Sequence, residues 1–511
     1  MSSFAERCGV HDAARAAACE RLLQSVREQR IDRIRIAWCD THGQLRCKTL
    51  TAAALAGALA EGVGLVGTLL LKDSADRTAF PVWEAQAAQD LPGFAFAGNL
   101  VLLPDPASFQ VLPWAEGLGW LRAEPWFPDA RPVPLDTRRV LQQALDRLAA
   151  RGFGLRCGLE VEFHVYRLAG AGGQAGPAGA GLAHELPLDP SLDPQQAGWP
   201  GPAPAVTLLH PGYRLLSEAD ADRCYEVFRI LQRTCEGLKL PLTSLEIEFG
   251  PSQFEAVFDV ADALLAADRM VLFRSAAAQA LRRAGYLASF VCRPPFPQVM
   301  ASGWHLHQSL FDLGTGAHVM GREAPAPGRG PAVAGHLVSD AGQAWLAGLL
   351  AHGRGMAVFC TPTIDGYGRF RPNALAPQSV LWGRDNRGAM LRVVGEPGAG
   401  AAATRIENRI GEHCANPYLY IASQVHAGLD GLAAEMRPPP GTDAPYAGAA
   451  TPLPASLGEA LDALAEDRSL CAAFGQPIVD WLVRIKRQEI ARFEAAEDRA
   501  EWLRREYFGR C

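Results

Sequence analysis

The chain has 511 residues, 49% of them hydrophobic, and carries 49 Lys and Arg against 55 Asp and Glu, for a formal net charge of −6. This length allows two or more domains around a large core, and the hydrophobic content is ordinary for a globular enzyme. The charge balance and the lack of a long basic run argue against nucleic acid or an anionic membrane surface as a partner. No apolar run reaches the roughly 18 to 20 residues that a membrane helix needs. The composition therefore favours an enzyme that acts on small molecules.

The number and spacing of the cysteines indicate the cellular compartment of the protein. The 12 Cys are scattered singly from Cys8 to Cys511, without a Cys-x-x-Cys pair, which favours reduced thiols over a disulfide framework. The first residues resemble neither a signal peptide nor a cationic, Ser-rich transit segment. We therefore expect a cytoplasmic protein.

The N-terminal quarter reads as a small α and β region. Apolar spacing predicts a helix over residues 12–30 and then a β-hairpin over residues 31–50, with Asp40-Thr41-His42-Gly43 as its turn. Further strand-like segments lie near residues 99–103 and 119–123. Residues 128–134 resemble a linker, so we predict an N-terminal domain over 1–125 and a second domain over 126–511.

The second domain is expected to alternate strands and helices. A helix over residues 137–151 precedes a strand containing Gly158-Leu159-Glu160-Val161-Glu162-Phe163. Residues 169–206 are dominated by Gly, Ala and Pro, which predicts a flexible surface insertion. Further helices are expected at about 218–236 and 261–284, on either side of a hairpin over 246–258, and the last part of the chain is expected to be mostly helical.

Acidic residues recur in strand-like phrases of this domain. Glu248 and Glu255 bound the phrase Glu-Phe-Gly-Pro-Ser-Gln-Phe-Glu, and Glu407 lies in Arg405-Ile406-Glu407-Asn408-Arg409. Side chains two residues apart on a strand share a face, so Glu160 with Glu162, and likewise His305 with His307, would project together. Burying such carboxylates costs on the order of several kcal/mol each unless cations or donors compensate them. An oxygen-rich site of this kind suits Mg²⁺ or Mn²⁺, and the interleaved arginines suggest phosphate chemistry.

Together with four more phrases, this ordered set resembles the glutamine synthetase family, bacterial type I branch. The further phrases are Ser302-Gly303-Trp304-His305-Leu306-His307-Gln308-Ser309, Tyr367-Gly368-Arg369-Phe370, Asn386-Arg387-Gly388-Ala389 and Ala415-Asn416-Pro417-Tyr418. The resemblance implies an α+β fold: a small N-terminal β-grasp-like domain and a large catalytic domain with a curved antiparallel sheet flanked by helices. It also implies a homo-oligomer, a dodecamer of two hexameric rings with active sites shared between neighbours.

The resemblance also implies a reaction. The family transfers the γ-phosphate of ATP to the side-chain carboxylate of glutamate, and an amine then displaces phosphate from the acyl phosphate. Two or three divalent ions, Mg²⁺ or Mn²⁺, are expected in each active site. By motif position, one ion matches the ligands Glu162, Glu248 and Glu255, and another matches Glu160, His305 and Glu407.

Other positions match substrate contacts of the family. Arg387 and Arg409 match groups that hold the transferred phosphate, and Arg369 matches an arginine that holds the substrate carboxylate. On the nucleotide side, the matching positions are Arg392, Arg405, His307 and Ser309. Tyr213 matches a residue at the ammonium pocket, and Asp40 matches an acid that a neighbouring subunit inserts there. Blander interpretations stay open: Asp40 as a plain turn residue, Tyr213 as a loop aromatic, and the arginines as a structural ion-pair lattice.

Departures from the family pattern bear on the amine. Ammonia-using members carry a flap glutamate where this chain has Leu375, and Met300-Ala301 and Trp304 also replace family residues. Loss of that carboxylate removes a counter-charge for ammonium and adds apolar surface. We therefore expect an organic amine as acceptor, with an alkyl or aromatic body. The alternatives are glutamine synthesis from ammonia, a related phosphotransfer reaction and a noncatalytic structural homologue.

Overall fold

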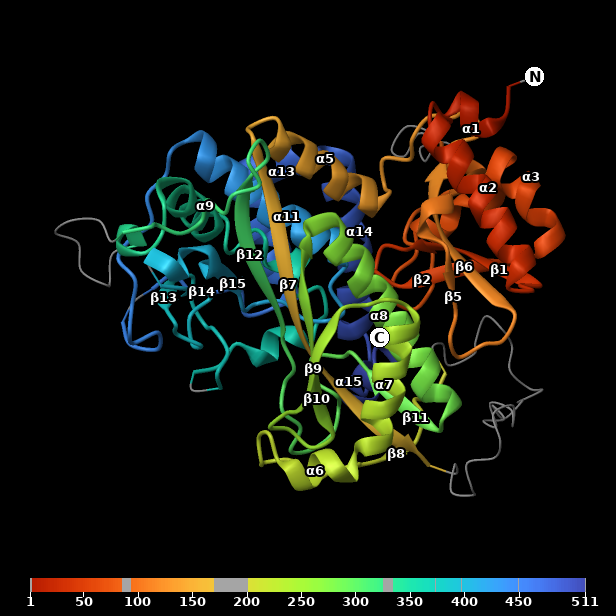
Figure 1. The fold of residues 1–511 in the computed structure, drawn as a ribbon. Helices are drawn as coiled ribbons and strands as arrows, with labels where there is room; N and C mark the ends of the chain where they lie inside the picture. Colours follow the sequence, from red (N-terminus) through yellow and green to blue (C-terminus); the bar gives the residue numbers. More distant parts are fainter. Residues whose placement is uncertain are drawn as a thin grey trace.

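The computed structural model describes residues 2–84, 93–169, 201–324, 334–372, 374–396, 398–448 and 450–510. Two β-sheets with helices packed around them make up the described chain (Figure 1). The α+β class predicted from the sequence is confirmed. The predicted flexible insertion at 169–206 lies, for residues 170–200, outside the described part of the chain.

The smaller sheet has the order β2-β1-β6-β4-β3, with β5 pairing to β6. As predicted, β1 and β2 form an antiparallel hairpin, while β1 runs parallel to β6. Its strands are β1 (Arg33–Cys39), β2 (Leu45–Thr51), β3 (Val63–Val66), β4 (Asn99–Pro104), β5 (Gln110–Val111) and β6 (Leu118–Trp126). In Figure 1 this sheet lies at one side of the molecule with α1 (Phe4–Arg7), α2 (Ala13–Glu28) and α3 (Leu55–Glu61).

The larger sheet has the order β13-β14-β15-β12-β7-β10-β9, and β8 and β11 also pair with β7. Its ladders are antiparallel except for the parallel pair β13 and β14. Its strands are β7 (Phe153–Leu168), β8 (Val206–Thr207), β9 (Leu242–Ile247), β10 (Gln253–Asp262), β11 (Tyr286–Ser289), β12 (Trp304–Asp312), β13 (Trp382–Arg384), β14 (Leu391–Val394) and β15 (Arg405–Asn408).

Helices and the segments that join them make up the remaining described chain. The expected helix at 218–236 is divided at Cys224, whose backbone leaves helical geometry at φ −96° and ψ 11°. The α-helices are α5 (Thr137–Ala149), α6 (Glu218–Arg223), α7 (Tyr225–Gly237), α8 (Ala263–Arg283), α9 (Asp340–Ala351), α10 (Ala357–Cys360), α11 (Pro417–Ala433), α12 (Leu457–Glu466), α13 (Arg468–Phe474), α14 (Gln476–Glu494) and α15 (Arg499–Glu506). Short 3-10 helices lie at Ala52–Ala54, Gly67–Leu70, Ala95–Ala97, Pro106–Ser108, Ala334–His336, Gly366–Arg369 and Gly398–Ala403.

Strand β7 shows why one face of the larger sheet carries the polar groups. Its residues alternate in burial, with Leu159, Val161 and Phe163 in the core and Glu160 and Glu162 on the opposite face. This alternation follows from the two-residue repeat of a strand. Helix α8 packs on the sheet and contacts α11, which is buried along most of its length. The helices thus cover the apolar side and leave the acidic side for other contacts.

The predicted boundary between residues 125 and 126 falls within the last two residues of β6 and stays a prediction. One hydrophobic core runs through both sheets, from Ile34 and Leu121 to Val161 and Ile406. Within the described residues, no helix is both long and apolar enough to cross a bilayer.

Candidate active site

Strand register aligns acidic and histidine side chains across the larger sheet. Glu255 of β10 lies opposite Glu162 of β7 and Glu246 of β9. On the other side of β7, Glu160 lies opposite His305 of β12. Residues directly opposite each other on paired strands share a face and lie within contact distance. The phrases that stood out in the sequence therefore form one continuous cluster.

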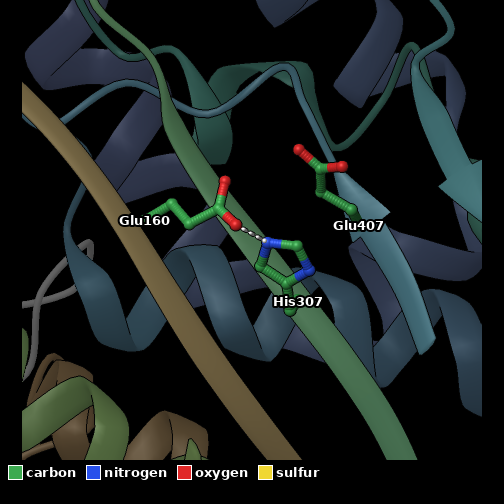
Figure 2. Close-up of side chains that lie close together, drawn as sticks. All are labelled: Glu160, His307 and Glu407. Atoms are coloured by element: carbon green, nitrogen blue, oxygen red, sulfur yellow. Dashed lines mark ion pairs between the residues drawn. The ribbon is translucent and has the colours of Figure 1, made fainter. Parts of the chain in front are cut away.

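The half of the cluster around Glu160 is bound together by imidazoles. His307 Nε2 lies 2.8 Å from Glu160 Oε1, and Figure 2 shows these side chains pointing toward each other, with Glu407 on the neighbouring strand. His305 Nδ1 lies 3.6 Å from Glu160 Oε2 and 3.8 Å from Glu407 Oε1. Burial would raise the pKa of Glu160, but its close contacts with His305 and His307 outweigh it and lower that pKa. Burial, reinforced by Arg409, lowers the pKa of His305 to about 4, so the ring is neutral at pH 7 and has a nitrogen lone pair for a metal.

The half around Glu162 consists of carboxylates that form no ion pair with a Lys or Arg of the described chain. Oxygens of Glu162, Glu248 and Glu255 lie within 4.8 Å of one another. Burial, with repulsion from Glu248, raises the pKa of Glu162 to about 8, and burial with repulsion from Glu162 raises that of Glu255 to about 9. Within the described residues no Lys or Arg forms an ion pair with any of the three. This uncompensated oxygen set fits a hard divalent cation.

Two further sets in the cluster have metal-like spacing. Ligand atoms of Glu160, His307 and Glu407 lie within 4.8 Å of one another, as do those of Glu160, Glu255 and His305. The structure thus brings together every residue predicted as a metal ligand, and their roles as ligands stay predictions. It also makes His307, which sequence matching assigned to the nucleotide, a candidate ligand.

The predicted arginines differ in their surroundings. Arg409 pairs with Glu407, which is 0% exposed, and Arg392 Nη1 lies 2.9 Å from the other oxygen of that carboxylate. Burial would raise the pKa of Glu407, but Arg409 and then His305 lower it to about 2, so the group is ionised at neutral pH. Glu407 therefore fixes two arginines beside the histidine pair.

The remaining arginines have other contacts. Arg369 is buried and donates to the carbonyls of Arg409, Ile410 and Gly411. Arg405 donates from Nε to His307 Nδ1 at 3.1 Å. Arg387 is exposed and makes no side-chain hydrogen bond or ion pair within the described part of the chain. Their predicted roles toward substrate and nucleotide stay predictions.

A cavity of about 320 Å³ adjoins the cluster. It is lined by Glu160, His307, Ser309 and Arg405 on its polar side, and Val260 contributes an apolar side. Ser309 Oγ donates to the carbonyl of Thr404 at 3.2 Å. The volume is within the range of small-molecule sites, and its lining includes His307, Ser309 and Arg405, which were predicted to contact the nucleotide.

Tyr213 and Asp40 lie outside the carboxylate cluster. Tyr213 is 48% exposed, its hydroxyl donates to the carbonyl of Gln298 at 2.6 Å, and its ring packs edge-on against Phe249 at 5.7 Å. Asp40 is 2% exposed and accepts backbone hydrogen bonds from His42 and Gln44 within its own turn. In the single chain Asp40 therefore stabilises its own turn. Its contribution to the active site of a neighbouring subunit stays a prediction.

Sequence reasoning assigned no role to Gln253. Its side chain is buried, donates to Ser302 Oγ at 2.9 Å and to Glu162 Oε2 at 3.3 Å, and accepts from the Gly250 N–H at 2.7 Å. Gly303 N–H donates to Glu162 Oε2 at 2.7 Å. Both groups orient the Glu162 carboxylate. The position of Gln253 two residues before Glu255, on the same face of a strand, was the available signal.

Comparison with known proteins identifies similar chains. A family model described as glutamine synthetase, catalytic domain, matches residues 134–505. The chain is 35% identical over 508 residues to the gamma-glutamylanilide synthase of Acinetobacter sp, with 96% of this chain and 95% of the relative covered. It is 29% identical to the gamma-glutamylethanolamide synthetase GlnA4 of Streptomyces coelicolor, with 94% and 93% covered. A solved GmaS/ADP complex matches at a TM-score of 0.72 and 26% identity, covering 95% of this chain and 98% of that one.

Proposed function

Because the chain belongs to the glutamine synthetase family, we propose that it ligates L-glutamate to an organic amine and releases ADP and phosphate. The family membership confirms the resemblance found in the motifs, and the chain is an ATP-dependent ligase that forms C–N bonds. The product would be a γ-glutamylamide, and the intermediate would be γ-glutamyl phosphate.

The chemistry needs an activated carboxylate, because a carboxylate does not react with an amine unaided. A γ-carboxylate oxygen of glutamate attacks the γ-phosphorus of ATP, and the bond from that phosphorus to the β-γ bridging oxygen breaks to release ADP. The amine then attacks the acyl carbon, its C–O bond to phosphate breaks, and the amine nitrogen loses a proton. Mg²⁺ or Mn²⁺ held by the carboxylates and histidines would neutralise charge on the transferring phosphoryl group. Arg409, which pairs with Glu407, would take up charge on that group, and Arg392, which pairs with the same carboxylate, would contact the nucleotide.

One observation carries the proposal of an organic amine: the position of Leu375. Its carbonyl accepts from Arg409 Nη2 at 3.3 Å, so its backbone adjoins the arginine that pairs with Glu407. Its side chain is 70% exposed, on a backbone with φ of 52°. An apolar side chain there offers no counter-charge to ammonium and favours a less hydrated amine.

A second apolar surface supports an alkyl or aromatic amine body. Phe249 is 42% exposed and directly follows Glu248, and Tyr213 packs against it. A polyamine would need acidic partners at its far end, whereas these residues offer aromatic faces. The similarity to a gamma-glutamylanilide synthase supports the same class of acceptor.

The test is a panel of amines with Mg-ATP and L-glutamate, measuring phosphate release and product mass. The panel contains ammonium, methylamine, isopropylamine, ethanolamine, putrescine, spermidine and aniline. We expect an alkyl or aromatic monoamine to exceed ammonium about tenfold in kcat/KM, or about 1.4 kcal/mol. Ammonium as the best acceptor would assign glutamine synthesis instead, and no turnover with any amine would favour the noncatalytic alternative.

The assembly belongs to the same proposal. We propose a cytoplasmic homo-oligomer, a dodecamer of two hexameric rings, in which Asp40 of each chain completes a neighbour's site. The support is family membership. The assembly is tested by measuring the mass of the native particle by light scattering.

A further inference from the structure

A cavity of about 350 Å³ lies between the smaller sheet and helix α8, and none of the predicted active-site residues lines it. Its walls come from β1, β6, the start of α5, the segment before β9, and α8. In Figure 1 these elements meet where the small sheet adjoins the rest of the molecule. The volume is at the lower end of the range for small-molecule sites.

One wall of the cavity is a fixed ion-pair lattice. Asp268 accepts from Arg122 Nη1 at 2.6 Å, from Arg138 Nε at 2.9 Å and from the Tyr418 hydroxyl at 2.7 Å. Arg122 also binds Asp105 at 2.6 Å. Charge-assisted bonds of this kind hold their partners in one geometry. This wall is therefore rigid, and its carboxylates are already satisfied.

Three buried polar atoms of the described residues on the cavity wall lack a hydrogen-bond partner: Arg122 Nε, Trp38 Nε1 and Asp136 Oδ2. Trp38 is 3% exposed and its indole Nε1 makes no hydrogen bond, and Asp136 is 7% exposed and its Oδ2 makes none. The nearest cation to Asp136 Oδ2 is Arg139 Nε at 3.7 Å, which is too long for a hydrogen bond. A buried donor and a buried acceptor at one cavity are costly unless a third molecule satisfies them.

The rest of the lining adds charge and apolar area. Arg269 and Lys239 line the cavity and make no side-chain hydrogen bond or ion pair among the described residues. Trp120, Leu240 and Leu272 give an apolar wall. The carboxylate of a ligand would therefore meet the indole N–H of Trp38 and the cations Arg269 and Lys239. An ammonium group of the ligand would meet Asp136, and an apolar part of the ligand would meet the remaining wall.

We propose that this cavity binds a zwitterionic α-amino acid with an apolar side chain, at a site separate from the reaction centre. Cys39 and Leu45, on either side of the turn that carries Asp40, also line it. A bound amino acid would thus contact both ends of that turn. The site does not depend on which amine the enzyme uses.

The test is calorimetric titration of the assembled full-length enzyme with L-phenylalanine and L-leucine. Saturating L-glutamate, ADP and Mg²⁺ are present throughout, so that the reaction centre is occupied. We expect saturable binding, and at least tenfold weaker binding of 3-phenylpropionate, which lacks the ammonium group, and of phenethylamine, which lacks the carboxylate. No binding at millimolar concentration, or equal binding of the truncated analogues, would overturn the proposal.

Two conservative variants and one matched control locate the site. Asp136→Asn keeps a good helix N-cap while removing the charge, because Asp136 caps α5 through Oδ1. Trp38→Phe keeps an aromatic ring at this position and removes the indole N–H. Trp114→Phe is the control, since it removes another buried indole N–H without a partner, at a residue that does not line the cavity. We expect at least tenfold weaker binding in the first two variants and wild-type affinity in the control; wild-type affinity in both of the first two would refute the site.

Discussion

Glu162 is the residue on which the metal site most depends. Its carboxylate is oriented by the Gly303 N–H and Gln253, it has two acidic neighbours, and among the described residues it forms no ion pair with a Lys or Arg. We expect Glu162→Gln to lower phosphate release about 100-fold or more, because a neutral amide is a weak ligand for a hard cation. The measurement is phosphate release at saturating Mg-ATP and glutamate.

Glu246→Gln is the matched control for that substitution. Glu246 lies in the same row of residues, but its Oε1 accepts from the Ser244 hydroxyl at 2.8 Å. It should retain most of the activity. Wild-type turnover in Glu162→Gln would contradict the assignment of the cluster.

Leu375 gives a second prediction at this scale. Leu375→Glu would add a negative group at the residue whose carbonyl accepts from Arg409, and should shift the kcat/KM ratio toward ammonium about tenfold relative to the best organic amine. Leu313→Glu is the control, because Leu313 is also an exposed leucine, at 48%, and follows β12 at the end remote from His305. An unchanged ratio in Leu375→Glu would show that this loop does not select the amine.

The sequence correctly predicted which side chains share a face of a strand, because the two-residue repeat of the strand alone determines this. Glu160 and Glu162 share a face because they lie two residues apart on β7. The bonds of Gln253 join β10 to Glu162 of β7 and to Ser302 in the segment before β12, so no local pattern in the chain specifies them. The same holds for Arg369, whose guanidinium binds backbone carbonyls after β15.

At the scale of elements, the site is a product of strand register. Pairing of β7 with β10 and β12 sets Glu162 opposite Glu255, and Glu160 opposite His305. Sequence spacing predicted these strands but not their order in the sheet, which depends on long-range pairing. The division of the expected helix at Cys224 was likewise missed, since apolar spacing continues through α6 and α7.

Clustering of carboxylates on adjacent strands predicts a pH dependence of stability. Folding raises the pKa values of Glu162 and Glu255 to about 8 and 9, whereas unfolded carboxyl groups titrate near about 4.3. A raised folded-state pKa contributes stability that is present below the unfolded pKa and is lost as pH rises through the folded pKa. The melting temperature of the metal-free protein should therefore fall from pH 6 to pH 9, and Mg²⁺ should reduce that fall.

The measurement is thermal unfolding in EDTA and in excess Mg²⁺ across this pH range. Glu255→Gln should give a shallower decline in EDTA, because one of the titrating groups is removed. A decline that is the same with and without Mg²⁺, and the same in the variant, would show that these carboxylates do not bind the ion.

In the whole molecule, the predicted α+β class is confirmed. The described chain contains one smaller and one larger sheet, as expected. One hydrophobic core continues through both sheets, and the boundary that composition and linker signals indicate at residues 125 and 126 stays a prediction. The assembly lies beyond a single chain. In this chain Asp40 is buried, and Arg46 Nε binds it at 2.8 Å.

Subunit sharing can be tested by complementation. Asp40→Asn keeps the hydrogen-bonding capacity of the turn, and Glu162→Gln removes a metal ligand. If neighbours share sites, each variant alone should be nearly inactive, while mixed oligomers should recover about a quarter of wild-type sites when the two subunits mix randomly in equal amounts. No recovery in purified, doubly tagged hybrids would contradict shared sites.

The central claim is that glutamate is activated by phosphorylation and then captured by an organic amine. It is tested most directly with L-glutamate carrying ¹⁸O in its γ-carboxylate, Mg-ATP, and a monoamine as the acceptor. We expect a γ-glutamylamide and phosphate that carries one ¹⁸O atom from glutamate, because the bridging oxygen leaves with phosphate. Amide formed with unlabelled phosphate, or phosphate released without an amide of the organic amine, would contradict it.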